Sequence, residues 1–267
     1  MSDIINLLPD DSLIIIIYKS NNCMCKFVCK RWNKICLNLN NYSPQKNKIQ
    51  ILNSNGKAHK KFILDNFVIT SIDQFNTTSE QIYGLVRYDE EHFNIQTPFF
   101  EISELCILSN FSDSAGILEF QLNNNCHNLK HFFNMIDKKM INNKEIIFSS
   151  TLFKNYDNTD FLKNYKIYEM VYEPIIKKDS FNDYYWTCMI NLSKDDIPIW
   201  RIEENNSPIR IHVQSLDRLS ECIPPRSSIK FILEFNKFYA NKIPINNILS
   251  YGISLGIKQI GFIPAKK

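Results

Sequence analysis

Short runs of β-branched and aromatic residues recur along residues 48–262, and they constrain the fold more than any other feature of the sequence. Runs of this length, bounded by Asn, Asp, Ser and Gly, are typical of β-strands. We expect strands at Lys48–Asn53, Phe67–Ile72, Gln81–Tyr88, Gly116–Leu122, Glu145–Phe148, Lys166–Tyr172, Tyr184–Leu192, Ile197–Ile202, Ile209–Val213, Ile229–Phe235 and Ile253–Phe262. No internal repeat is visible, so leucine-rich, kelch and WD-repeat domains are not indicated.

One segment of this region has helical periodicity instead. Between Asn128 and Ile141, apolar residues recur every three or four positions, at Leu129, Phe132, Phe133, Ile136 and Met140. Many strands with one long helix favour a barrel or sandwich over alternating βαβ units. The turn-forming residues Ser193–Asp196 predict a hairpin between the strands on either side. We therefore expect a mostly antiparallel β domain, a barrel or sandwich.

The first forty residues differ from the rest and predict two short helices. Pro9 suits the first turn of a helix, where Asp10 and Asp11 place negative charge at its positive end. After Ser20–Asn22, a second apolar face is formed by Met24, Phe27, Val28, Trp32 and Ile35. The polar stretch Asn40–Pro44 marks a boundary. The chain is thus expected to be α+β, with a helical module at 1–42 and the β domain at 45–267.

The N-terminal module carries a resemblance to a known family. Leu8-Pro9-Asp10 with Leu13, an aliphatic run, and then Phe27-Val28-Cys29-Lys30-Arg31-Trp32 resemble the F-box, as in F-box proteins of the giant-virus type. The usual loop between the two ends is replaced by the shorter Ser20–Asn22. The resemblance implies docking onto a Skp-type adaptor of a cullin-RING ubiquitin ligase through Leu8, Pro9, Leu13, Ile16, Ile17, Val28, Cys29 and Trp32. The alternative is an ordinary helical hairpin that caps the next domain.

Parts of the β domain are similar to the OB-fold single-stranded DNA-binding proteins of large DNA viruses. The segments are Phe132–Asp137, Tyr168–Pro174, Tyr185–Trp186, Ile197–Trp200, Ile229–Ile232 and Tyr251–Ile253. OB-folds bind strands by stacking bases on aromatic side chains beside a basic groove. The resemblance implies a nucleic-acid site at Tyr185, Trp186, Trp200, Arg210 and Lys230. The alternative is that these aromatic residues pack in the core.

Composition narrows the remaining classes of function. The net charge of +3 is too small to require nucleic acid or an anionic membrane as partner. No apolar stretch approaches the roughly 20 residues of a membrane span, so we expect an intracellular protein of the cytoplasm or nucleus, in a host cell if the protein is viral. In a reducing compartment, the 8 cysteines are expected to be free thiols.

Metal and catalytic sites are not indicated by the sequence. Cys23, Cys25, Cys29 and Cys36 lack the paired spacing of zinc knuckles, and His127 with His131 needs a third ligand from elsewhere. There is no P-loop, dinucleotide-binding glycine pattern, G-x-S-x-G or HExxH, so no cofactor and no enzymatic activity are expected. The sequence favours an adaptor that joins Skp to an unidentified protein substrate, and a single-stranded nucleic-acid-binding protein is the alternative.

Overall fold

The computed structural model describes residues 49–53, 56–58, 62–70, 81–122, 126–149, 168–180, 183–193, 197–203 and 208–265. This part of the chain is a mostly β domain with few helices. The predicted N-terminal helix pair, the residues predicted to contact Skp and the predicted boundary at Asn40–Pro44 lie outside the described residues.

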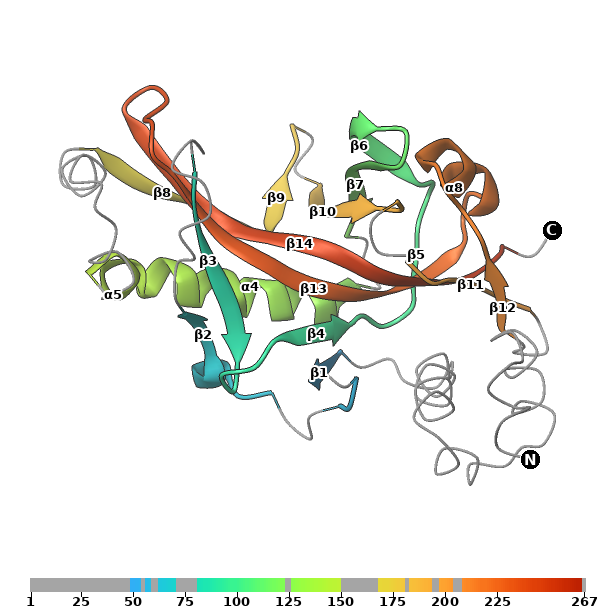
Figure 1. Cartoon of the computed structure of the whole chain (residues 1–267), viewed down its shortest axis with the longest axis horizontal. Helices are drawn as coiled ribbons and strands as arrows, with labels where there is room; N and C mark the ends of the chain where they lie inside the picture. The colour runs from blue at the N-terminus through green and yellow to red at the C-terminus, as the bar shows by residue number, and fades with distance from the viewer. Residues whose placement is uncertain are drawn as a thin grey trace.

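A long antiparallel ribbon of two strands, β13 (Ser228–Asn241) and β14 (Ile248–Ile263), forms the centre of the sheet (Figure 1). In the turn between them, Asn246 and Asn247 have φ of 51° and 64°. Two consecutive positive φ values are typical of a type I′ hairpin, and asparagine tolerates them. A register shift just after Phe235 interrupts the alternation of β13. This irregularity explains why the sequence predicted the end of the strand there.

Each edge of the ribbon carries three short strands from separate parts of the chain. Along β13 lie β3 (Gln81–Tyr88), β4 (Phe93–Gln96) and β5 (Phe100–Glu101), all antiparallel to it. Along β14 lie β8 (Glu169–Glu173), β10 (Tyr184–Asn191) and β11 (Ile199–Ile202), all parallel to it. The sheet is extended by β1 (Gln50–Asn53), β2 (Phe67–Thr70), β6 (Cys106–Ser112), β7 (Ala115–Gln121), β9 (Ile176–Lys178) and β12 (Pro208–Ile211).

The predicted hairpin at Ser193–Asp196 is wrong. β10 pairs in parallel with β14 at Met189 and Gly256, and β11 pairs in parallel with β14 at Ile199 and Ile260. The chain therefore keeps its direction from β10 to β11, whatever path residues 194–196 take. Ser, Asp and Lys indicate a break in a strand, but they do not indicate whether the chain reverses there.

The helices are α4 (His127–Asn142), α5 (Lys144–Ser149), α8 (Leu216–Cys222) and the 3-10 turn η2 (Leu64–Asn66). α4 confirms the predicted helix. The strand predicted at Glu145–Phe148 is wrong, because these residues form most of α5, and a run this short fits one helical turn as well as a strand. α8 was not predicted, although Ser215 caps it by accepting a hydrogen bond from the Arg218 backbone N–H at 3.3 Å.

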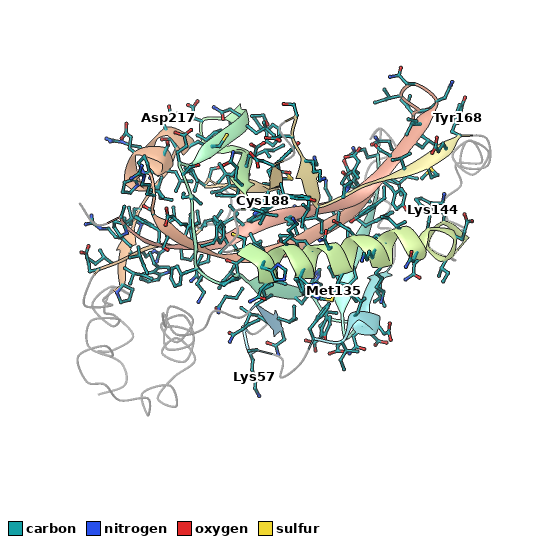
Figure 2. The ribbon with its side chains drawn as sticks, turned by 180° about the vertical axis from the view of Figure 1, so that it is seen from behind. Lys57, Met135, Lys144, Tyr168, Cys188 and Asp217 are labelled. Carbon is teal, nitrogen blue, oxygen red and sulfur yellow. The ribbon has the colours of Figure 1, made fainter. Side chains whose placement is uncertain are left out.

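The core lies between the sheet and α4, which runs along one face of the ribbon (Figures 1 and 2). Trp186 on β10 is 0% exposed, and its ring centroid lies 5.0 Å from that of Phe120 and 5.5 Å from that of Phe133 on α4. Phe231 on β13 lies 4.8 Å from Phe120 in the same cluster. We call this covered side of the sheet the inner face and the opposite side the outer face.

A buried carboxylate joins α4 to the sheet. Asp137 is 5% exposed and accepts hydrogen bonds from the Tyr172 hydroxyl at 2.8 Å and the Ile175 backbone N–H at 3.0 Å. Burial raises the pKa of Asp137 above its usual value of 3.8, although these hydrogen bonds oppose the shift. Burial, together with the Asp137 charge, raises the pKa of Tyr172 well above 10. Asp137 therefore holds the end of β8 and the start of β9 against the helix.

Candidate functional site

Small residues line β14 on the outer face of the ribbon. Gly252, Ser254 and Gly256 alternate with buried apolar residues, so their positions point away from the core. Gly252 is required by packing, because a Cβ there would lie 2.7 Å from the hydroxyl oxygen of Tyr239. Gly256 is not required by packing, because a Cβ there would meet nothing nearer than the Asn236 side chain at 3.8 Å. The backbone of β14 at Gly256 is therefore open to close approach from outside.

A lysine lies over a tyrosine ring beside the strip of small residues formed by Gly252, Ser254 and Gly256. The Nζ of Lys237 on β13 lies 3.7 Å from the ring centroid of Tyr83 on β3, and both side chains are half-buried. The Tyr83 hydroxyl donates to Gln81 Oε1 at 3.0 Å, and Gln81 Nε2 donates to Asn241 Oδ1 at 2.8 Å. This chain of hydrogen bonds fixes the orientation of the ring, whereas the Lys237 ammonium forms no hydrogen bond or ion pair with a described residue and contacts the ring face.

The carboxylates near the strip are already engaged. Glu173 on β8 accepts a hydrogen bond from the Tyr239 hydroxyl at 2.7 Å. Burial and this carboxylate raise the pKa of Tyr239 above its usual value of 10. Glu234 on β13 forms an ion pair with Lys258 at 3.1 Å. Among the described residues, Lys237 has no carboxylate partner, so its positive charge is available to an anion that approaches this face.

A second group of basic and aromatic side chains lies where β10 begins. Tyr184 has the Nζ of Lys130 on α4 at 3.1 Å and the Nζ of Lys178 on β9 at 4.9 Å from its ring centroid. A hydrogen bond from Lys178, followed by the charges of Lys130 and Lys178, lowers the pKa of Tyr184 below its usual value of 10. The three elements that bear these residues pair or pack against one another in the fold.

Three of the residues predicted to bind nucleic acid lie in one row across adjacent strands. Trp200 on β11 is the register partner of Arg210 on β12, and Trp200 and Lys230 both pair with Gly261 on β14. Trp186 and Trp200 are 0% and 5% exposed, so both are buried, but only Trp186 belongs to the hydrophobic core cluster. Lys230 is 3% exposed, and its Nζ lies 5.3 Å from the ring centroid of Phe99. Tyr185 and Arg210 are half-buried on β10 and β12, which are not adjacent strands. The row of Arg210, Trp200 and Lys230 is mostly buried and Tyr185 and Trp186 lie elsewhere, so the five residues form no continuous exposed surface.

The sequence patterns did not single out Tyr83 or Gly256, which both belong to the outer-face arrangement. Tyr83 lies in a predicted strand, and the alternation of Gln81–Tyr88 could have assigned it to the exposed side. Gly256 lies in a chain with only 6 glycines, so a glycine inside a strand was the available signal.

Histidine, cysteine and acidic side chains do not gather into a metal site in the part of the chain that the structure describes. His127 and His131 are exposed on α4 while Cys126 is buried, and no group of three His, Cys, Asp or Glu side chains is placed to hold a metal ion there. Within the same ranges, Cys106, Cys126, Cys188 and Cys222 carry free thiols. No helix of this part of the chain is long and apolar enough to cross a membrane.

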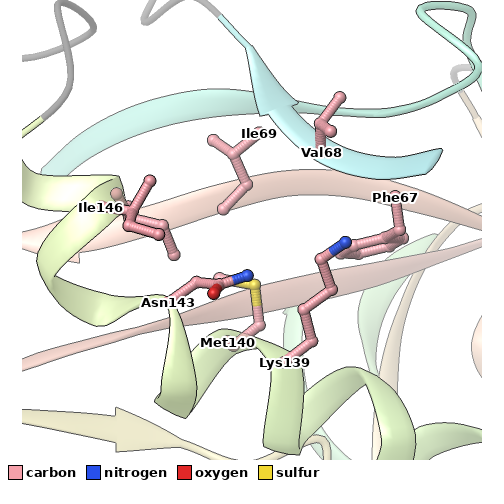
Figure 3. Close-up of a pocket in the computed structure, with 8 residues that line it drawn as sticks. Phe67, Val68, Ile69, Lys139, Met140, Asn143 and Ile146 are labelled. Atoms are coloured by element: carbon pink, nitrogen blue, oxygen red, sulfur yellow. The ribbon is translucent and has the colours of Figure 1, made fainter. Parts of the chain in front are cut away.

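One pocket of about 220 Å³ lies between β2 and the corner formed by α4 and α5 (Figure 3). It is lined by Phe67, Val68, Ile69, Lys139, Met140, Asn143, Ile146 and Ile147. The Lys139 ammonium donates to the Leu64 carbonyl oxygen at 2.5 Å and lies 4.0 Å from Asp65. Burial lowers the pKa of Lys139, and Asp65 opposes this shift. With its one charged group engaged, the pocket is essentially apolar and offers no catalytic groups.

Comparison with known proteins gives little further guidance. No family model matches the chain and no curated protein matches it, so the resemblance of the N-terminal segment to the F-box stays a prediction. Among solved structures, a single-stranded DNA-binding protein from bacteriophage Enc34, in complex with ssDNA, is similar with a TM-score of 0.34 and 6% identity, covering 73% of this chain and 97% of that chain. At this TM-score the likeness decides neither fold nor function.

Proposed function

We propose that the outer face of the β13–β14 ribbon binds single-stranded nucleic acid in the manner of an OB-like domain. The observation that carries the proposal is the Lys237 ammonium over the Tyr83 ring, with no carboxylate partner among the described residues. Binding of single strands without sequence preference needs an aromatic ring for a base and a cation for the adjacent phosphate. Tyr83 and Lys237 supply both groups on neighbouring strands.

Replacing the Lys237–Tyr83 contact by a stacked base and a phosphate contact is expected to be energetically favourable. A cation–π contact contributes about 0.5–1 kcal/mol at an exposed site and about 2 kcal/mol when desolvated, and this half-buried pair lies between the two. A base stacked on an aromatic ring contributes about 1–3 kcal/mol, and the freed ammonium also gains a phosphate contact. Lys237 can therefore leave the ring for a phosphate, which frees the ring face for a base. The strip at Ser254 and Gly256 lets the strand lie close to the sheet, because no long side chain rises from β14 there.

Replacing Tyr83 by alanine is expected to weaken binding of labelled oligo-dT by about 1–3 kcal/mol, measured by fluorescence anisotropy. Lys237→Gln should weaken binding and reduce the salt dependence by about 0.7 in slope, because one phosphate contact is lost. Gly256→Val should weaken binding without changing charge, since the new side chain would lie between the strand and the sheet.

Matched controls lie elsewhere on the surface. Phe111 on β6 is 60% exposed, and Lys138 is exposed on α4, so Phe111→Ala and Lys138→Gln remove an aromatic ring and a charge away from the ribbon. Both controls should bind as the wild type does. Oligo-dT binding that is undetectable in the wild type, or unchanged in the Tyr83, Lys237 and Gly256 variants, would show that this face is not the site.

A second candidate function, the adaptor of a ubiquitin ligase, rests on the N-terminal sequence from Leu8 to Trp32. Large exposed apolar surfaces commonly mark partner sites, and the short helix pair predicted from this sequence could not bury this many apolar residues by itself. The full chain should retain a Skp-type adaptor in a pull-down, and Trp32→Ala should cost more than about 2 kcal/mol of that affinity if Trp32 is the anchor. A wild type that fails to retain the adaptor would exclude this function.

A further inference from the structure

The second group of basic residues surrounds the Tyr184 ring on the helix-covered side of the sheet. Lys130, Lys178 and Tyr184 come from α4, β9 and β10, and each side chain is at least partly exposed. Two ammonium groups converge on one ring, at 3.1 and 4.9 Å from its centroid. Two positive charges directed at the same ring repel each other, and an anion bound between them would relieve that repulsion.

No carboxylate of the described residues lies within ion-pair distance of either ammonium group, although Asp179 and Asp183 flank Lys178 and Tyr184 in the sequence. Neither lysine forms an ion pair there, and neither has an interaction beyond the contacts with Tyr184. The first turn of α4, which bears Lys130, contains no acidic residue. Each ammonium group can donate three hydrogen bonds, and Lys178 is exposed while Lys130 is half-buried, so both can reach a ligand from solvent.

We propose that Lys130, Lys178 and the Tyr184 hydroxyl form a site for a phosphate group. A phosphate carries up to two negative charges and presents three acceptor oxygens, which matches two cations and a hydroxyl better than a carboxylate does. The site is separate from the strip on β14, because Tyr184 belongs to the side of β10 that bears Trp186, whereas the strip lies on the outer face. It therefore stands or fails independently of nucleic-acid binding by the ribbon.

Titration of the full chain with inorganic phosphate at constant ionic strength tests the site, with binding followed by isothermal calorimetry. Lys130→Gln and Lys178→Gln should each weaken phosphate binding about fivefold, which corresponds to about 1 kcal/mol, and the double variant should abolish it. Tyr184→Phe keeps the ring and removes the hydroxyl, so it should weaken binding less. Lys138→Gln, an exposed lysine of the same helix, should bind phosphate as the wild type does.

A second arm identifies the source of the phosphate. Greater affinity for oligo-dT with a 5′-phosphate than for the same oligonucleotide without it, lost in the double variant, would assign the site to a strand end. Equal affinities would leave a small phosphate as the ligand. Inorganic phosphate that does not bind the wild type, or that binds the double variant equally well, would overturn the proposal, provided that denaturant unfolding shows both proteins folded.

Discussion

Trp186→Ala is expected to destabilise the protein by about 3–5 kcal/mol, the usual range when a large aromatic side chain is removed from a core. Trp186 is 0% exposed and lies against Phe120, Phe133, Phe100 and Phe231, so the variant would leave a cavity between α4 and the sheet. Chemical denaturation followed by circular dichroism measures the loss. At a typical domain stability of about 5–15 kcal/mol, a loss of this size would remove much of the total.

Two further variants separate packing from polarity. The Trp186 Nε1–H has no acceptor among the described residues, so Trp186→Phe removes an unsatisfied donor along with part of the ring. It should cost much less than the alanine variant. The neighbouring Tyr185→Ala, half-buried on the other side of β10, should also have a small effect. A Trp186→Ala protein with unchanged stability and weaker oligonucleotide binding would instead place Trp186 in a binding site.

Asp137→Ala is expected to destabilise the protein by about 3 kcal/mol at neutral pH. The substitution leaves the Tyr172 hydroxyl and the Ile175 N–H buried without their acceptor, and a hydrogen bond to a charged group contributes about 1.5–3 kcal/mol. Asp137→Asn keeps an acceptor oxygen for both donors and should cost about 1 kcal/mol or less. Equal losses in the two variants would contradict a role that depends on the acceptor.

The pH dependence of stability gives the Asp137 prediction a second measurement. Because the pKa of Asp137 is raised in the folded state, the folded protein holds this proton more tightly than the unfolded chain does. The stability that protonation of Asp137 adds is therefore fully present below about pH 4, and it is lost as the pH rises through the raised pKa. Asp137→Asn should remove this decline from a plot of unfolding free energy against pH. A decline that persists in the variant would assign it to another group.

Local patterns explain which parts of the fold the sequence could predict. The alternation at Gln81–Tyr88 and the three-to-four spacing along α4 reflect burial of one side, and both elements were predicted with nearly correct bounds. β6 was missed because it is mostly exposed and has no alternation between polar and apolar residues. The parallel order of β8, β10 and β11 along β14 depends on contacts between distant segments, which no local pattern records.

The candidate site was less predictable than the fold for the same reason. Aromatic residues on strands are conspicuous in the sequence, yet Trp186 lies in the core, because large rings contribute most to a core, and Trp200 is buried outside the core cluster. Tyr83 and Lys237 are neighbours only because β3 pairs with β13 across about half of the chain. Lys130, Lys178 and Tyr184 likewise meet only after α4 lies against β9.

The position of the β13–β14 ribbon late in the chain has a consequence for biosynthesis. Six short strands, three on each edge, pair with the ribbon, and the ribbon is translated after all six of them. Chains emerge from the ribosome at roughly 5–20 residues per second, so the strands from β3 to β11 wait for several seconds without their partner. During that interval their unpaired edges are exposed to other chains. Chaperones that bind extended apolar segments are therefore expected to engage the nascent protein until β14 has emerged.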